Sequence, residues 1–566
     1  MHVEFLTGSS GSGKSKRLYD ILLDMSQENP DKKIFLVVPE QFTMQAQRNI
    51  VENSPGHGTF NIDIVSFNRL AYRIFEELGI ELPTAIDDTG KNLILRKIID
   101  ENKKDFKIIR AKDSQGFVSE IKSVISELLQ YSVTADMLKD ACGRLSTGGI
   151  NNNERLRRKL EDISLIYSAF KEYISDKYIT TEEVTAILCR YVDKSELLKN
   201  AVFAFDGFTG FTPVQYQLIE LLFDKADTMY FTLTLPQDGD RWLFDMSYDE
   251  LRRIGECADR HHVRVRRMNV GEAVPYRFKD SPQLAHLERN LYRDMAQYDG
   301  EADNITIYSA LGKKAEVSYV ASRIKSLVEN GLRYRQIGVI VSSMADYKEL
   351  LASIFEENKI PVFMDNKRSI LANPAVEYIR AALAIVEKDY SYESVFRGYM
   401  CKNSGRFVDS VGSLDIFENY VLALGIRGHK KYTEAFRRRY PSRRGMDLDV
   451  INDIRVKLLE LMEPVYQVFH DKDSTAADYI DTMLQFLDES MVYEQLEQLK
   501  ELMEKENQAA AAKEYGQSYE KIIALFEQTK KLLGEEKMGI REFSDILDAG
   551  FNEIKIGIIP PTLDMV

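Results

Sequence analysis

Short runs of β-forming residues alternate with helical patterns over the first hundred positions of the chain. Residues 2–7, 33–38 and 60–67 are rich in Val, Ile, Leu and Phe and are typical of short strands. Between them, residues 14–25 and 45–51 place apolar side chains at the spacing of one helix face. Strands that alternate with helices in this way predict a parallel α/β sheet.

The alternation of strands and helices then stops, because the residues from about 92 to 200 have the pattern of amphipathic helices and no strand pattern. Strand patterns return at 201–205 and 229–235, so we expect the first sheet to be completed after a helical excursion. This predicts a discontinuous first α/β domain formed by residues 1–92 and 200–275. Residues 93–199 are predicted to form its helical insert.

A second α/β unit is expected further along the chain. A polar segment at about 270–303 resembles a linker, and the apolar runs at 305–311 and 337–341 that follow it predict new strands. A last strand is predicted at 554–559.

The helical block that separates these strands covers residues 376–545 and is predicted to be a second insert. Residues 300–375 and 546–566 would then form the second α/β domain. Because the chain ends seven residues after its last predicted strand, we expect this domain to be truncated and the chain to be a fragment of a longer protein.

Composition places the protein among ordinary globular chains. Its 566 residues include 75 Lys and Arg against 89 Asp and Glu, a net charge of −14, and 44% are hydrophobic. No apolar run reaches the roughly 18 residues of a membrane span, and no secretory leader pattern opens the chain. We therefore expect a soluble, cytoplasmic protein. Four widely spaced cysteines are expected to be free thiols: Cys142, Cys189, Cys257 and Cys401.

The strongest chemical signal is the sequence GSSGSGKS, which follows the first predicted strand and opens the first predicted helix. In this GxxxxGK[ST] pattern, the glycines let backbone N–H groups surround phosphate oxygens at a helix N-terminus. Lys14 would contact the β- and γ-phosphates of ATP, and Ser15 would supply a hydroxyl to Mg²⁺. The predicted ATP-binding residues are Gly8, Ser9, Ser10, Gly11, Ser12, Gly13, Lys14 and Ser15.

A phosphate loop of this kind works with an acidic residue at the end of a neighbouring strand, which helps to hold the metal ion. Asp206 follows the predicted strand 201–205 and is the candidate, although an Asp here could also simply begin a turn. Motor ATPases usually have Glu at the next position, whereas this chain has Gly207. We therefore predict binding of ATP and Mg²⁺ with weak turnover, unless a carboxylate comes from elsewhere.

The residues that follow parallel strands share one edge of a sheet with the phosphate loop, and we call this edge the rim. Segments 39–43, 66–72 and 207–209 place amides, hydroxyls, an arginine and aromatic rings there. Rings and guanidinium planes stack on bases, so the rim favours single-stranded nucleic acid. For each residue alone, packing is the alternative, and we expect Phe42 and Leu70 to lie in the core.

Basic residues gather in two segments despite the negative net charge. Residues 251–268 contain six Arg against two acids, and residues 401–444 contain ten Lys and Arg against four acids. Either cluster could be a solvated surface or a contact to a nucleic-acid backbone. The density of the second cluster makes it the better candidate for backbone contact.

Several segments together resemble one known family. They are similar to the B subunits of the bacterial AddAB helicase-nucleases, from the first residue to the last, in GSSGSGKS, VPEQFTMQAQ, SFNRLAYR, GFVSEIKSVISEL, AFDGFTGFTPVQ and IGVIVSS. The resemblance implies a superfamily-1-like helicase core, with two P-loop or RecA-like α/β domains that each carry a helical insert. It also implies a heterodimer with an AddA-type helicase-nuclease subunit, which uses ATP to unwind and degrade double-stranded DNA ends for homologous recombination and DNA repair.

The resemblance further implies that the B subunit is helicase-like without being the motor, and that it recognises the Chi sequence in single-stranded DNA. The Chi-reading residues would be Gln41, Thr43, Phe67, Arg69, Tyr72 and Phe208. Phe208 could exchange roles with Phe211. The family's nuclease site and iron–sulfur cluster would belong to a C-terminal half that this chain lacks, so none of its cysteines is assigned to a cluster.

Two other functions stay open at this point. The first is an autonomous DNA-dependent ATPase or helicase motor. Its ATP-hydrolysing site would be formed by Lys14, Ser15 and Asp206. The second is a phosphotransferase of the small nucleotide-kinase type, against which the long helical insert and the duplicated α/β units weigh.

Overall fold

The computed structural model divides into two compact units. Unit 1 comprises Met1–Ile86 and Ser123–Tyr308, and unit 2 comprises Asp87–Lys122 and Ser309–Val566. Within these ranges the structure describes all residues except 55–57, 59–60, 108–114, 148–152, 176, 238, 272–273, 294, 365–367, 402–410, 439–446, 507 and 558–563. The predicted four-part domain division stays a prediction.

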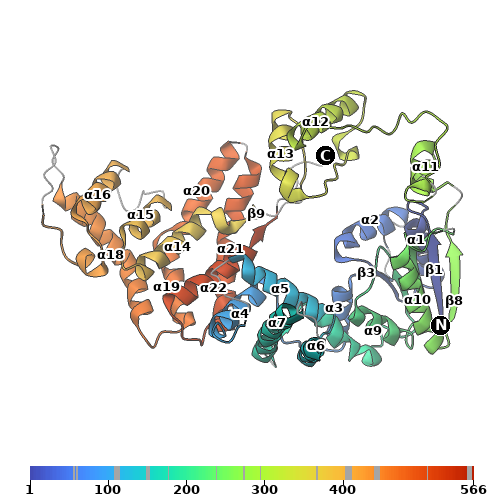
Figure 1. The fold of residues 1–566 in the computed structure, drawn as a ribbon, viewed down its shortest axis with the longest axis horizontal. Helices are drawn as coiled ribbons and strands as arrows, with labels where there is room; N and C mark the ends of the chain where they lie inside the picture. Colours follow the sequence, from blue (N-terminus) through green and yellow to red (C-terminus); the bar gives the residue numbers. More distant parts are fainter. Residues whose placement is uncertain are drawn as a thin grey trace. The chain divides into compact units, whose positions relative to one another are not determined.

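Unit 1 is built on a six-stranded parallel sheet with the strand order β3-β2-β6-β7-β1-β8. Figure 1 labels β1, β3 and β8 of this sheet. Its strands are β1 (His2–Gly8), β2 (Ile34–Val37), β3 (Ile62–Val65), β6 (Val202–Phe205), β7 (Thr228–Thr234) and β8 (Arg264–Asn269). Every residue of β2 and β6 is buried, as expected for parallel strands that are covered on both faces.

Successive residues of these strands face opposite sides of the sheet, and the alternation gives unit 1 two apolar cores. Phe5 and Phe203 belong to one core, whereas Leu6 and Val202 belong to the other. The helices of unit 1 are α1 (Lys14–Glu28), α2 (Thr43–Asn53), α3 (Phe67–Glu77), α6 (Ala135–Thr147), α7 (Asn153–Ile174), α8 (Val184–Cys189), α9 (Pro213–Leu222), α10 (Asp245–Arg260) and α11 (Pro282–Asn290). Helix α5 (Gln115–Gln130) crosses the division between the units.

The strands predicted for the first sheet are confirmed within one or two residues at each end. Two further features were not predicted. The edge strand β8 has the sequence RVRRMN, whose charged residues lack a strand's apolar pattern. The region expected to be free of strands contains β5 (Tyr178–Thr180), which pairs in parallel with β4 (Thr84–Ile86).

Unit 2 is almost entirely helical. Its helices are α4 (Asp88–Glu101), α12 (Lys313–Glu329), α13 (Met344–Glu357), α14 (Pro374–Glu387), α15 (Tyr392–Cys401), α16 (Val411–Leu424), α17 (His429–Thr433), α18 (Leu448–His470), α19 (Ala476–Glu489), α20 (Val492–Lys505), α21 (Ala509–Leu533) and α22 (Ile540–Glu553). Short 3₁₀ turns occupy Glu40–Phe42, Val192–Lys194 and Tyr276–Phe278 in unit 1, and Tyr334–Gln336 and Ile370–Ala372 in unit 2.

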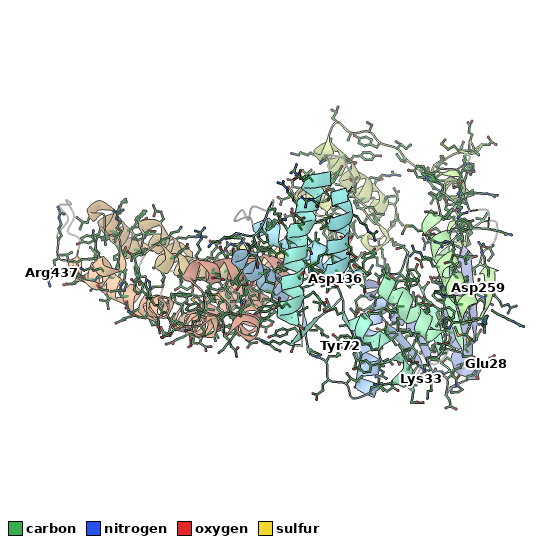
Figure 2. The ribbon with its side chains drawn as sticks, turned by 60° about the horizontal axis from the view of Figure 1, so that its bottom comes forward. Glu28, Lys33, Tyr72, Asp136, Asp259 and Arg437 are labelled. Carbon is green, nitrogen blue, oxygen red and sulfur yellow. The ribbon has the colours of Figure 1, made fainter. Side chains whose placement is uncertain are left out.

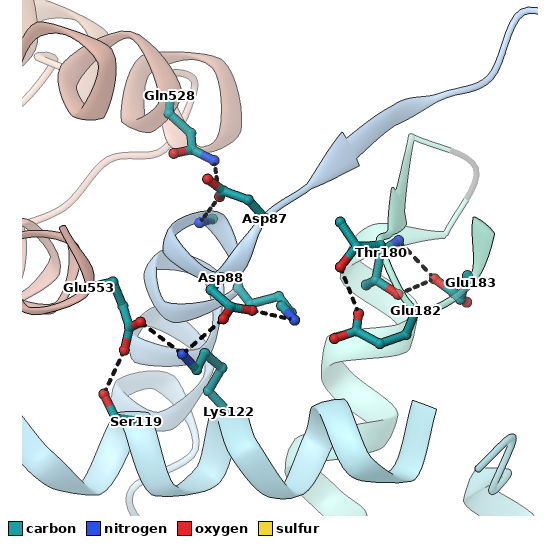
Figure 3. Close-up of polar contacts among 12 residues, drawn as sticks. Asp87, Asp88, Ser119, Lys122, Thr180, Glu182, Glu183, Gln528 and Glu553 are labelled. Carbon is teal, nitrogen blue, oxygen red and sulfur yellow. Dashed lines mark hydrogen bonds and ion pairs between the residues drawn. The ribbon is translucent and has the colours of Figure 1, made fainter. Parts of the chain in front are cut away.

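Helix α4 is packed against α21 and α22, and polar contacts hold it there. Lys122 on α5 donates to Asp88 at 3.4 Å and to Glu553 on α22 at 2.8 Å (Figure 3). The side chain of Gln528 on α21 donates to Asp87 at 2.7 Å. Residues 87–122, which are mostly part of the predicted first insert, are therefore grouped with unit 2 in the structure.

The strands predicted at 305–311 and 337–341 are wrong as secondary structure, because neither segment forms a strand in the structure. Their alternating apolar residues have strand propensity, but a strand also needs a hydrogen-bonded neighbour. Ile307 and Ile340 are 94% and 98% exposed. Of the strand predicted at 554–559, the structure forms β10 (Lys555–Ile556), which pairs in antiparallel fashion with β9 (Arg368–Ser369), and residues from 558 on lie outside the described part.

None of the described helices is both long enough and apolar enough to cross a membrane.

Candidate nucleotide site and adjoining rim

The phosphate loop lies where the sequence predicts it, between the end of β1 and the start of α1. Gly11 and Gly13 have φ values of +75° and +95°, which lie in the left-handed region that glycine adopts without strain. Gly13 is the residue before the first turn of α1, so the loop turns directly into the positive end of a helix. The backbone geometry is that of an anion-binding loop.

Lys14 folds back over this loop. Its ammonium donates hydrogen bonds to the carbonyl oxygens of Gly8 at 3.1 Å and Ser9 at 2.8 Å. Burial lowers the pKa of Lys14 to about 8, although the nearby carboxylates of Asp206 and Glu288 act in the opposite direction. A phosphate in the loop would offer this ammonium a charged acceptor in place of two neutral carbonyls.

Asp206 lies at the centre of a hydroxyl network. Ser15 Oγ donates to its Oδ1 at 2.9 Å, and Thr232 Oγ1 donates to the same oxygen at 2.6 Å. Tyr19 donates its hydroxyl to Oδ2 at 2.8 Å, and both burial and the carboxylate raise the pKa of Tyr19. The pairing of Asp206 with Ser15 is the arrangement that the loop motif calls for, and it favours the metal-associated role over a simple turn.

The sequence reasoning missed Tyr19 and Thr232. A signal for Tyr19 existed, because it follows Ser15 by four residues and so lies on the same face of α1. Thr232 had no local signal, since its position depends on the pairing of β6 with β7.

The donor set fits Mg²⁺, which prefers oxygen ligands and keeps several of its waters. Ser15 offers a hydroxyl, and Asp206 offers a carboxylate hydrogen-bonded to it. No cluster of three or more His, Cys, Asp or Glu side chains suited to a metal ion occurs in the described part of the chain. Any ion here would therefore share its coordination with phosphate oxygens and water.

The residue after Asp206 adopts a conformation that suits glycine. Gly207 has a φ of +79°, and a Cβ at this position would come within 3.6 Å of the Phe42 ring. A glutamate here would have to adopt a left-handed backbone, which is unfavourable for residues with a side chain. The chain therefore lacks both the carboxylate of a motor ATPase at this position and the backbone geometry that would accommodate one easily.

The predicted rim residues divide into buried and exposed groups. Thr43 is 3% exposed and donates to the carbonyl of Glu40 at 2.9 Å, and Phe67 is 6% exposed. Gln41, Arg69 and Tyr72 are exposed, and Phe208 is half-buried. Figure 2 labels Tyr72, which is 47% exposed on α3.

Two expectations about rim packing have opposite outcomes. Leu70 is 1% exposed and lies in the core, as predicted. Phe42 is 42% exposed, so its predicted core position is wrong. Phe42 belongs to a 3₁₀ turn after β2, where successive residues do not alternate between the core and the solvent as they do in a strand.

Three aromatic rings of the rim pack against one another. The Phe67 ring lies 5.5 Å from that of Phe208 and 6.1 Å from that of Phe211, and the last two are 4.9 Å apart. Both Phe208 and Phe211 are half-buried, so the geometry leaves their interchange open. Arg69 extends over this edge and donates to Glu40 at 3.1 Å, with both side chains more than half exposed.

The basic cluster at 251–268 is in part neutralised within unit 1. Arg252 pairs with Asp249 and Glu256, and Arg260 pairs with Glu220. This favours a solvated surface for α10. Half of the ten basic residues in the cluster at 401–444, which was predicted to contact a nucleic-acid backbone, lie outside the described residues: Lys402, Arg406, Arg439, Arg443 and Arg444.

A parallel sheet whose first strand leads through GxxxxGKS into a helix, with an acidic residue after a nearby strand, is the arrangement of a P-loop domain. Residues 5–288 match the family described as ADDB, N-terminal, and residues 281–550 match the UvrD-like helicase C-terminal domain. The chain belongs to the AddB family, the B subunits of ATP-dependent helicase/deoxyribonucleases, and it has a superfamily-1-like helicase fold.

Individual relatives agree with this assignment. Over its full length the chain is 36% identical to the B subunit of an ATP-dependent helicase/deoxyribonuclease from Lachnoclostridium phytofermentans. It is 34% and 32% identical to the corresponding B subunits from Clostridium novyi and Clostridium kluyveri, again over its full length. The chain spans about half the length of the curated relatives it matches, covering 49% to 50% of these three.

Proposed function

We propose that this chain is the helicase-like part of the B subunit in a heterodimeric ATP-dependent helicase and deoxyribonuclease. It binds ATP with Mg²⁺ at the phosphate loop and reads Chi in single-stranded DNA at the rim, while an AddA-type partner acts as the motor. The complex would process double-strand DNA breaks for homologous recombination in the cytoplasm. Its nuclease site and iron–sulfur cluster would lie beyond the residues of this chain.

The observation that carries this proposal is the contrast between an intact phosphate loop and the residue that follows Asp206. The contact of Lys14 with the loop carbonyl of Ser9 and the hydrogen bond from Ser15 to Asp206 support binding of a polyphosphate and its metal ion at these residues. Gly207 supplies no carboxylate to orient an attacking water. Binding without appreciable turnover is the activity that this combination supports best.

In this proposal the chain's own residues perform the binding steps. Backbone N–H groups of the loop and the N-terminus of α1 hold the phosphates, and Lys14 moves from its two carbonyl acceptors to a phosphate oxygen. Ser15 and Asp206 would hold Mg²⁺, which would supply positive charge against the polyphosphate.

Lys14→Ala tests the nucleotide site. In the 566-residue chain, titration with a fluorescent ATP analogue should show binding that weakens by at least about tenfold in this variant, because a charge-assisted contact is lost. Lys16→Ala removes an exposed lysine two residues further along and should bind as the wild type does. DNA-stimulated ATP hydrolysis should be close to background. Strong turnover that Lys14→Ala abolishes would contradict the proposal and support an autonomous motor.

Arg69→Ala tests the rim. In the complex with the partner subunit, this change should weaken the response to Chi and leave Chi-independent DNA degradation unchanged, because Arg69 is an exposed side chain of the rim. Arg73→Ala is the matched control, since it removes the same charge one turn further along α3. An equal loss of the Chi response in both variants would show a general charge effect and contradict the assignment of Arg69.

A further inference from the structure

The segment after β8 packs directly on the phosphate loop, although its sequence resembles a linker. We call residues 270–271 and 274–290 the strap, and residues 272 and 273 between them lie outside the described part. The Val270 N–H donates to the Thr7 carbonyl at 2.6 Å. A Cβ added to Gly8 would lie 2.3 Å from the Val270 carbonyl oxygen, and one added to Gly271 would lie 2.7 Å from Ser12 Cβ. The strap and the loop are therefore in close contact.

Arg277 is the strap residue that crosses the loop. Its backbone N–H donates to the Gly11 carbonyl at 3.1 Å. Its Cβ lies 2.6 Å, and its Cδ 3.3 Å, from the position that a Cβ on Gly11 would occupy. Only glycine at position 11 leaves room for this side chain, so the stem of Arg277 packs directly against the phosphate loop.

The Arg277 guanidinium is available to a ligand. The side chain is exposed, and no ion pair with it is recorded within the described residues. Its positive charge contributes to lowering the pKa of Lys14, so the guanidinium lies within electrostatic range of that ammonium. The carboxylates of Asp206 and of Glu288, which is on α11 of the strap, act on the pKa of Lys14 in the opposite direction.

Ser12 supplies a second, independent sign of a ligand. The residue is 7% exposed, and its Oγ has no hydrogen-bond partner among the described residues. A buried hydroxyl without a partner is unfavourable, and an anion in the loop could accept its hydrogen bond.

We propose that Arg277 is a nucleotide-binding residue, which the strap supplies to the phosphate loop as a second cation for a nucleoside polyphosphate. The inference deepens the ATP-binding role proposed above and rests on it. Two cations beside one glycine-rich loop favour a ligand with several negative charges. The contribution of Arg277 therefore grows with the number of phosphates.

The test is a titration of the 566-residue chain with ATP and with AMP in the presence of Mg²⁺. Arg277→Gln should weaken ATP binding on the order of ten- to a hundredfold, as expected for the loss of a charged hydrogen-bonding partner, and should weaken AMP binding less. Arg277→Lys should restore part of the affinity. Arg289→Gln, which removes an exposed arginine from α11 of the same strap, should bind as the wild type does.

The outcomes of this titration distinguish a failure of the Arg277 inference from a failure of the ATP-binding proposal on which it rests. If Arg277→Gln binds ATP as tightly as the wild type while Lys14→Ala does not bind, the role of Arg277 is overturned and the nucleotide site stands. If Arg277→Gln weakens ATP and AMP equally, a structural effect on the loop explains the loss and the inference is overturned. If the wild-type chain does not bind ATP, both proposals are overturned.

Discussion

Removing the hydroxyl of Tyr19 should destabilise unit 1 by an amount that can be worked out from the contacts of Asp206. The carboxylate belongs to a residue that is 5% exposed. Two of its hydroxyl donors, Ser15 and Thr232, share Oδ1, so Tyr19 is the donor recorded for Oδ2. Tyr19→Phe leaves that oxygen buried without this partner. A hydrogen bond to a charged group contributes about 1.5–3 kcal/mol, which is the expected loss in the free energy of unfolding.

Tyr230→Phe is a control in the same apolar core. Tyr230 is 6% exposed, and its hydroxyl contacts Met25 Sδ at 3.8 Å, which is a weak acceptor. Its loss should lower stability by no more than about 0.5 kcal/mol, the lower end of what an ordinary hydrogen bond contributes. Hydrogen exchange of peptides from β6 and α1 at increasing urea concentrations reports on unit 1 alone. If the two variants differ by less than about 0.5 kcal/mol, the reasoning about Asp206 is refuted.

Two further predictions concern unit 2. Burial raises the pKa of Glu553, but the hydrogen bond and charge of Lys122, together with hydrogen bonds from Ser119 and Asn92, outweigh it, so that the pKa lies below its ordinary value of 4.5. Glu553→Gln should therefore lower the melting temperature at pH 7, and the difference from the wild type should disappear as the pH falls through this lowered pKa, because the wild-type carboxylate then becomes protonated. Gly550→Ala would place a Cβ 2.4 Å from Leu525 Cδ1. Urea unfolding should show a loss of about 1–3 kcal/mol from overpacking between α22 and α21, and an unchanged stability would contradict the close approach.

The first sheet could be predicted from the sequence because local pattern and packing agree there. Strands such as β2 and β6 are apolar throughout, and the sheet that buries them is contained in the same unit. The edge strand β8 could not be found in this way, because its exposed and charged residues gain their conformation from pairing with β1. The segments 305–311 and 337–341 are the opposite case. Their residues have strand propensity, but neither segment pairs with a neighbouring strand, so neither belongs to a sheet.

The same contrast between local pattern and contacts with distant segments explains which parts of the nucleotide site could be predicted from the sequence. The phosphate loop is encoded by eight consecutive residues, so a local motif is enough to find it. Thr232 and Arg277 lie more than 200 residues away from the loop in sequence. Their contacts form only in the folded chain, so no local pattern predicts them. Polar residues at 270–290 are typical of a linker, and only tertiary contact shows that this strap covers the loop.

Burial also changes how the rim can be interpreted. Phe67 lies in the core and contacts Phe205, Phe208 and Phe211, so its replacement by Ala would remove packing worth about 3–5 kcal/mol. A loss of DNA recognition in that variant would therefore say little about direct contact. The exposed Arg69 can meet a base or a phosphate without unfolding. If the rim reads a sequence, its exposed residues make the contacts, and Phe67 fixes the position of the rings beside them.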